Sequence, residues 1–443
     1  MLFRLRFLGM IAFVIALASW EISLQAQGTT NFAAWKEAKN ADDISEWARR
    51  LLIRDFRDVS GPAREELLAK TLFALKEIAA DSNVVPSTRY NAILTIGQLV
   101  SQEANPGSGN LPAAYPAALP YLLDLYQEAE APHYLQYGAL LGIVRHTICG
   151  MEPAQRDRVI DLLLETIITE HSVSEIALDL GTVPLESAVW DWFRLTALDG
   201  LSALKTAGMN GKVVTELLSV ITNKSQELED LCRRQDLFTR GEWEQTRRAM
   251  ELASKAAKTL GDLDYPSATG IDPEIITDTF VTFIKTVCDI EHKMVADAMG
   301  QDNSSLLPTV LIEQIVIDLK TCIQSVFWGI RREFLTGRPA AEHSFFLSLK
   351  SEAAKKRAEA LLSALIELSA FLDEGDKENR QSTTDGAGAN APKKFKFDLP
   401  DLRDMLAKSS ETLAKMGRKN EDPPGIVCVQ SSRFYDLNVD TLL

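Results

Sequence analysis

Cysteine and histidine are both scarce in this sequence, which has five of each in 443 residues. The cysteines stand at positions 149, 232, 288, 322 and 428 without a C-x-x-C pair, and five are too few for a disulfide scaffold. The histidines are equally scattered, at positions 133, 146, 171, 292 and 343, whereas zinc sites need clustered ligands. We therefore expect no metal and no cofactor. The odd cysteine count leaves at least one thiol outside any intramolecular disulfide.

Recognisable catalytic motifs are also lacking. The chain contains no G-x-S-x-G elbow and no G-x-G-x-x-G loop. Gly208 to Lys212 resembles half of a phosphate-binding loop, but Thr206 replaces the first glycine and Val213 follows the lysine. The dipeptide Glu291-His292 lacks the second histidine of a metalloprotease helix, so we interpret it as part of a solvated helix face. The sequence favours a non-enzymatic protein; the enzymatic alternative requires an acidic pocket in the insertion His171–Glu186.

Positive charge is in deficit, because 47 Lys and Arg face 62 Asp and Glu, which gives a formal net charge of -15. Phosphate groups are repelled by an acidic surface, so this balance disfavours a non-specific nucleic-acid binder. We interpret the excess of acidic residues as serving solubility. The apolar content of 46% is typical of a soluble globular protein, and the length allows two or three folding units.

The first 26 residues predict an export signal. Arg4 and Arg6 precede Phe7–Trp20, an uncharged and mostly apolar run that is shorter than the ~20 residues of a membrane-spanning helix. Leu24-Gln25-Ala26 resembles the small-residue pattern of a cleavage site. We therefore predict export to the periplasm or cell envelope. An uncleaved anchor in the inner membrane, facing outward, is the alternative, and only then would the protein meet the membrane.

Helical periodicity dominates the chain after a predicted N-terminal helical segment at residues 27–58. Tyr90, Ile93, Leu94, Gly97 and Val100 lie on one face of a helix that begins at residue 86. Further helices are predicted over residues 63–80, 116–130, 132–146, 153–169, 187–205, 212–223 and 241–263, with a Pro- and Gly-rich loop at 105–120. Small residues such as Gly97 are expected to let a neighbouring helix approach closely.

A degenerate repeat connects these helices within residues 59–268. Ala92, Ala139, Ala197 and Ala256 recur at steps of 47, 58 and 59 residues, and a glycine follows each of them by three or five positions. The first step fits a two-helix repeat of ~40–47 residues. A non-repeating helical domain with shared small residues is the alternative.

At these residues the chain resembles HEAT-like repeat proteins. The segment Arg89–Leu99 is also similar to segments of secreted, uncharacterised planctomycete proteins. The resemblance covers about Gly61 to Leu263. It implies a scaffold of stacked helices with a binding surface, and it carries no catalytic residues.

Longer helices are predicted after residue 268. Residues 269–373 should form a bundle, in which helices over 276–298 and 312–330 make an antiparallel hairpin and a third runs from Glu342 to Leu372 with a 3.5-residue period. Residues 374–397 are interpreted as a disordered linker. Residues 398–443 are expected to hold a last helix over 399–416 and a tail.

Two groups of side chains are candidates for sites. Antiparallel pairing of the two long helices would place Cys288 level with Cys322, and either a disulfide or two buried thiols would fit. Trp190, Trp192 and Phe193 could line a groove for a partner, although core packing is the favoured interpretation.

Together these patterns predict an all-α protein: an irregular α-solenoid of HEAT-like helix pairs, then a bundle of long helices, then a C-terminal helix after the linker. The predicted function is a non-enzymatic exported scaffold that binds another protein through the concave face or an exposed groove of the stack, since such repeats supply extended surfaces. The alternative is a structural protein of the cell envelope that self-associates through residues 272–372. The partner and the oligomeric state stay open.

Overall fold

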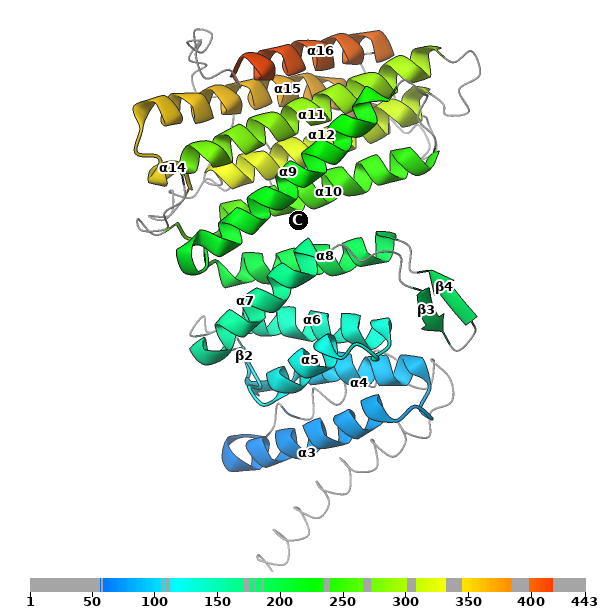
Figure 1. The fold of residues 1–443 in the computed structure, drawn as a ribbon, viewed down its shortest axis with the longest axis vertical. Coiled ribbons are helices and arrows are strands. Elements are labelled where there is room, and N and C mark those ends of the chain that lie inside the picture. The colour runs from blue at the N-terminus through cyan, green and yellow to red at the C-terminus, as the bar shows by residue number, and fades with distance from the viewer. Residues whose placement is uncertain are drawn as a thin grey trace, which may run out of the picture. The chain divides into compact units, whose positions relative to one another are not determined.

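The computed structural model describes residues 56, 59–104, 107, 112–169, 175–178, 181–184, 187–234, 240–265, 272–300, 308–331, 345–384 and 398–416. The predicted signal, nearly all of the predicted N-terminal segment, and the tail after Met416 lie outside this part. Within it the protein is all-α, with two short two-stranded ribbons besides the helices (Figure 1), so the predicted fold class is confirmed. None of the described helices combines the length and apolar character that crossing a lipid bilayer requires.

The chain divides into two compact units, residues 1–159 and 160–443. The boundary falls within helix α7 (Pro153–Ile168). It therefore lies inside the region 59–268, which we expected to form one repeat domain.

In the first unit, each helix packs against helices that are adjacent or nearly adjacent to it in the sequence. These are α3 (Gly61–Ala80), α4 (Pro86–Gln98), α5 (Ala118–Gln127) and α6 (His133–Cys149). Helix α4 packs against both α3 and α6, and α5 packs against α6. Strand β1 (Val100–Gln102) pairs antiparallel with β2 (Ala113–Ala114), so a ribbon brackets the expected Pro- and Gly-rich loop.

A glycine pair sets the crossing of α4 and α6, as the small-residue pattern predicted. A Cβ atom added to Gly97 would lie 2.5 Å from the Cα atom of Gly142. Real Cβ contacts are not that short, so any larger residue at position 97 would push the two helices apart. Ile93 and Ile96 of α4 are completely buried, while Tyr90 and Leu94 are half-buried.

The second unit begins with the part of α7 from Ile160 onward, which is followed by a β-hairpin and then by long helices. The hairpin pairs β3 (Glu175–Leu178) with β4 (Gly181–Pro184). After it come α8 (Ser187–Leu204), the 3-10 turn η2 (Met209–Gly211), α9 (Lys212–Arg233), α10 (Arg240–Asp262), α11 (Pro273–Gly300), α12 (Pro308–Arg331), α14 (Phe345–Ser348), α15 (Glu352–Thr384) and α16 (Leu399–Met416).

Helices α11 and α12 contact each other, as the predicted hairpin requires, but each of them makes a more extensive contact with another helix. Helix α12 packs mainly against α10, while α11 packs mainly against α16 and α9 (Figure 1). Leu402, Leu406 and Leu413 of α16 are buried, as expected for a helix that docks through one face. The last helix therefore completes the bundle instead of standing apart from it.

Glycines again mark the closest contact in the second unit, between α10 and α12. A Cβ atom on Gly261 would lie 2.1 Å from the carbonyl oxygen of Trp328. One on Gly329 would lie 2.7 Å from the carbonyl oxygen of Ala257. The Ala256–Leu263 segment thus behaves as the similar Ala92–Leu99 segment does in the first unit.

The region predicted as a linker starts later than expected. The third long helix, α15, begins at Glu352 after the short α14, and it continues to Thr384. Residues 374–384 are therefore helical, and our assignment of them to a disordered linker was wrong. Those eleven positions contain no proline, and their glutamate, lysine, arginine and glutamine side chains are compatible with a helix, so little in the local sequence stops one that has already formed.

Candidate functional site

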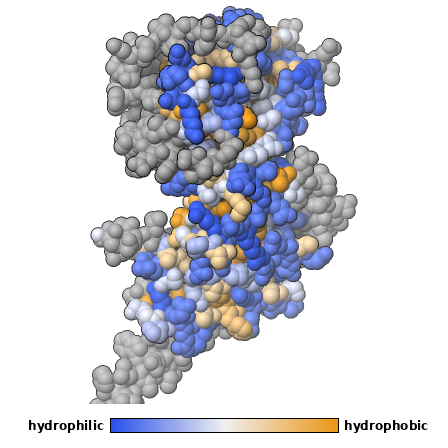
Figure 2. Space-filling view, turned by 60° about the vertical axis from the view of Figure 1, so that its left-hand side comes forward, coloured by the Kyte–Doolittle hydropathy of each residue, from blue (hydrophilic) through white to orange (hydrophobic). Residues whose placement is uncertain are grey.

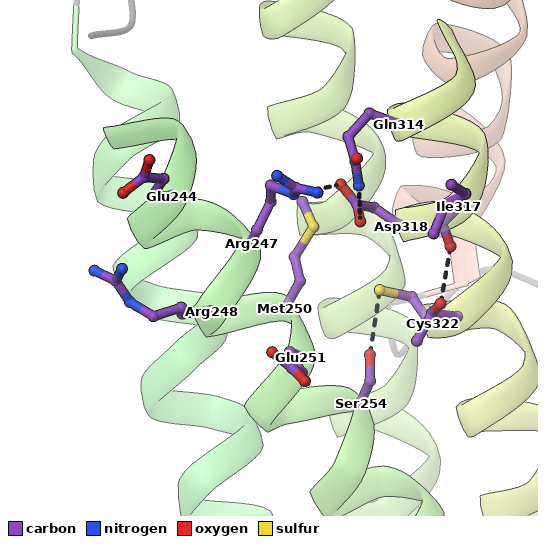
Figure 3. Close-up of a pocket in the computed structure, with 11 residues that line it drawn as sticks. Glu244, Arg247, Arg248, Met250, Glu251, Ser254, Gln314, Ile317, Asp318 and Cys322 are labelled. Atoms are coloured by element: carbon purple, nitrogen blue, oxygen red, sulfur yellow. Dashed lines mark hydrogen bonds and ion pairs between the residues drawn. The ribbon is translucent and has the colours of Figure 1, made fainter. Parts of the chain in front are cut away.

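An open groove of about 490 Å³ lies between α10 and α12 in the second unit (Figure 3). Cavities of ~300–1,000 Å³ are typical of sites that hold small ligands or single side chains. The groove is lined by Glu244, Arg247, Arg248, Met250, Glu251, Ser254, Gln314, Ile317, Asp318, Thr321 and Cys322.

Helical spacing brings these side chains together. On α10 each of the lining positions 244, 247, 248, 250, 251 and 254 has another lining position three or four residues away, and the same holds on α12 for 314, 317, 318, 321 and 322. Each set therefore occupies one stripe of its helix. The close glycine contact of Gly261 with α12 holds the two stripes beside each other.

An ion pair crosses the groove. The Nε atom of Arg247 lies 3.5 Å from Oδ2 of Asp318, and Gln314 donates a hydrogen bond of 2.9 Å to Oδ1 of the same carboxylate. These three side chains point toward one another in Figure 3. Arg248 lies on the side of α10 away from α12 and pairs with Asp191 of α8 at 3.4 Å.

A thiol and a hydroxyl meet at the floor of the groove, where Ser254 donates a hydrogen bond of 3.2 Å to Sγ of Cys322. Burial raises the pKa of Cys322 to about 12, although the Ser254 hydrogen bond opposes that shift. Burial also raises the pKa of Cys288 well above its usual range, and a negative charge on Cys322 would raise it further. Both thiols are consequently protonated at neutral pH and poor nucleophiles.

Cys288 and Cys322 are both buried, and both are free thiols in the structure. Cys288 lies on α11 and Cys322 on α12. A disulfide between them stays a prediction.

Glu291 of α11 is fully buried and is not among the residues that line the groove. Neither of its carboxyl oxygens makes a hydrogen bond with any described residue. Burial raises the pKa of Glu291 well above its usual range; the nearby charge of Asp318 adds to this shift and that of Arg247 opposes it. Burial also raises the pKa of Asp318, while Gln314 and Arg247 lower it. Two carboxyl groups with raised pKa values therefore share one region.

Our interpretation of Glu291-His292 as a solvated helix face was wrong for the glutamate. Glu291 follows Cys288 by three residues and precedes Met294 by three, so it lies on the buried stripe of α11. This position in the apolar pattern was the signal that could have revealed a buried acid. A charged residue on such a stripe is rare unless it is paired or functional.

The three aromatic candidates separate in the structure. Trp190 and Phe193 are buried, with ring centroids 5.1 Å apart, and they pack in the core of the second unit. Trp192 is 59% exposed. The three do not form one groove, because positions 190 and 193 share a helical face that 192 does not.

Two candidates remain, the segment Gly208–Lys212 and the insertion His171–Glu186. Gly208 and Gly211 have positive φ values of 75° and 73° and form the turn into α9, while Lys212 pairs with Asp161 at 2.7 Å. Within the insertion His171–Glu186, the backbone of Glu175–Leu178 and Gly181–Pro184 forms the β3–β4 hairpin, and the side chains and the other residues of the insertion lie outside the described part. Across the described part of the chain, no group of three or more His, Cys, Asp or Glu could hold a metal ion.

Comparison with known proteins identifies no relative: no protein-family model, curated protein or solved structure matches this chain. The face in Figure 2 is covered mainly by hydrophilic residues with small hydrophobic patches between them. The groove between α10 and α12 is the candidate site that the described residues define best. Glu291, whose pKa burial raises, is completely buried and does not line the groove.

Proposed function

We propose that the protein is a non-enzymatic, exported helical scaffold that binds another protein through the groove between α10 and α12. The observation that carries this proposal is an open groove whose walls combine charged side chains with an exposed apolar one. Ile317 is 49% exposed at its edge, beside the Arg247–Asp318 pair. Protein-binding sites commonly combine an apolar contact with polar groups that fix orientation.

The helix packing supports the scaffold part of the proposal. Close glycine contacts join α4 to α6 and α10 to α12, at related sequence segments. Recurrent contacts of this kind suit HEAT-like stacking, in which each helix pair covers the apolar face of the next. Export is proposed from the N-terminal sequence pattern alone, and fractionation of cells that make the full chain would test it.

A peptide-display selection on the full chain tests the function. Selected peptides should lose at least about tenfold in affinity for Ile317→Arg, because a buried charge would meet the apolar contact. Ile275→Arg is the matched control, since Ile275 is a 53% exposed isoleucine of α11 that does not line the groove. Equal losses in both variants, or no selectable peptide, would overturn the proposed site.

Self-association through the long helices is the second candidate. Exposed apolar residues on α11 and α12 favour it, namely Ile275, Met299, Val310 and Ile317. Light scattering after size exclusion separates the two candidates. A dimer that Ile275→Arg converts to monomers, with peptide binding absent, would favour the structural role.

A further inference from the structure

The groove between α10 and α12 opens on one side of the point where the two backbones meet. Three contacts advance together along the helices: Arg247 with Asp318, Ser254 with Cys322, and Gly261 with Trp328. The two helices therefore run in the same direction. The backbones meet at Gly261, and every lining residue precedes that contact, at positions 244–254 and 314–322. The walls consequently leave room between them for a third element (Figure 3).

The α12 wall carries no charge at its exposed positions. Among the described side chains of α12, the exposed ones are Val310, Ile317, Thr321 and Gln324. Their spacing of seven, four and three residues places them on one face of the helix, over about 20 Å. We call these four residues the α12 stripe. Charged residues make up 25% of the chain, so an exposed helix face without one indicates a contact surface.

The α10 wall has the opposite character. Apart from Gly241, the exposed side chains described on α10 are Glu244, Arg247, Glu251 and Lys258. Their charges alternate in sign along the helix, and the first three of them line the groove. A groove with one uncharged wall and one charged wall is complementary to a partner whose own surface is divided in the same way.

The walls offer an occupant side chains but no backbone partners. Both are α-helices, whose interior N–H and C=O groups are bonded within the helix. An extended peptide would find no strand edge to pair with, and a polyproline segment would find no aromatic side chain among the lining residues. A helix satisfies its own backbone groups and therefore suits these walls.

We propose that the groove binds an amphipathic α-helix of a partner protein, which packs its apolar face on the α12 stripe and turns charged side chains toward α10. This inference rests on the proposed function, and it names the structural class of the partner. Basic side chains of the partner helix should lie opposite Glu244 and Glu251, with an acidic one opposite Arg247 between them. Helices bound in grooves use anchors three, four and seven residues apart, as the α12 stripe does.

The first test selects binders of the full chain from two display libraries of peptides of about 18 residues, long enough as helices to span the stripe. One library fixes an apolar stripe at helical spacing and varies the other positions, and the second adds a proline in the middle. Binders that Ile317→Arg weakens should come from the helical library. A central proline placed in each selected peptide should then weaken it about tenfold or more, because proline breaks a helix.

This comparison separates the inference from the proposed function. If the proline library yields equally tight binders that Ile317→Arg weakens, the proposed function stands and the inference of a helical partner fails. If neither library yields a binder, the proposed function fails with it.

The second test changes each wall in turn. Thr321→Glu should weaken the selected peptides about tenfold or more, because the new charge would lie against their apolar face. Thr282→Glu is the matched control, since Thr282 is an exposed threonine of α11 that does not line the groove. Glu251→Lys should weaken the peptides about threefold, as expected for an exposed charge pair. Changing one basic residue of the peptide to glutamate should restore binding to Glu251→Lys.

Equal losses for the two threonine variants would overturn the inference, and so would a loss in Glu251→Lys that no charge-reversed peptide restores. A dimer of the full chain that excludes the peptides, and that Thr321→Glu alone converts to monomers, would also overturn it, because a second copy would then occupy the groove. Both threonines are exposed, so thermal unfolding of the two variants should match that of the unaltered chain.

Discussion

The two units of the molecule pack their helices in the same way, but one buries a basic side chain and the other an acidic one. Each brings two helices together through glycines, Gly97 with Gly142 in the first unit and Gly261 with Gly329 in the second. The first unit buries His146, which is 1% exposed, and the second buries Glu291 completely. Helix packing is therefore shared, while the charge buried within it is specific to each unit.

This difference gives the two units opposite responses to pH. Burial, together with the charge of Arg145, lowers the pKa of His146 to about 4, so the folded first unit prefers the neutral imidazole. Burial raises the pKa of Glu291, so the folded second unit prefers the protonated acid. One unit should lose stability as pH falls and the other as pH rises.

The glycine contacts should give the largest effects. Gly261→Ala should destabilise the second unit by about 1–3 kcal/mol or more, because its Cβ would meet backbone at 2.1 Å. Gly97→Ala should do the same to the first unit, where the contact is 2.5 Å. Urea unfolding followed by peptide-resolved proteolysis reports each unit separately.

Gly300→Ala is the control for both glycine variants, because nothing lies within 4 Å of its added Cβ atom. Its effect should stay within about 0.5 kcal/mol, since only helix propensity changes. A loss as large as that of Gly261→Ala would show that contact distance does not govern these positions.

The pH responses come next in size. His146→Met should remove the acid sensitivity of the first unit, which amounts to about 3 kcal/mol between pH 6.5 and pH 4 in the unaltered chain. The sign is fixed because the unfolded imidazole takes up a proton below pH 6.5 and the folded one does not until about pH 4. The same urea assay across pH measures it.

Glu291→Gln should flatten the pH response of the second unit. The unfolded carboxyl loses its proton near pH 4.5, whereas the folded one keeps it, so stability falls as pH rises from that value through the raised pKa. Glu359→Gln, which changes an exposed acid on α15 that does not line the groove, serves as the control and should leave the slope unchanged. Identical pH slopes for the two units would contradict the comparison.

The loss of an ion pair should give the smallest difference in stability between the two units. Arg158 pairs with Asp124 at 2.8 Å in the first unit with both side chains largely exposed, so Arg158→Met should cost about 0.2–1 kcal/mol. Arg357 pairs with Asp278 at 2.6 Å between α15 and α11, where the side chains are 19% and 33% exposed. Arg357→Met should cost more, about 1–2 kcal/mol, because less water screens the pair. Double-mutant cycles with Asp124→Asn and Asp278→Asn isolate each coupling.

Local pattern predicted most helices but not their partners. The spacing of Tyr90, Ile93 and Gly97 indicated α4 and its close approach to another helix, and Leu402, Leu406 and Leu413 indicated the docking face of α16. The end of α15 was missed because continuation of a helix depends on neighbours as well as on composition. Trp190 and Phe193 were grouped with Trp192 because proximity in sequence was given more weight than helical face.

The candidate site was largely beyond prediction. Asp318 and Arg247 are 71 positions apart, and no short motif connects them. The sequence shows that Glu291 lies on the apolar face of α11. Its pKa, however, also depends on the charges of Asp318 on α12 and Arg247 on α10, which only the structure reveals. Electrostatic coupling depends on distances between helices, which a single sequence does not encode locally.

The sequence by itself determined that this chain is helical, where most of its helices lie, and which small residues permit close contacts, because these depend on the 3.6-residue period of one helix. Only the tertiary structure decided that a groove lies between α10 and α12, that Glu291 is completely buried, and that Trp192 is exposed at the surface. Those outcomes depend on which face of each helix contacts which neighbouring helix. The contacts of the whole unit together determine this, because every helix packs against several others.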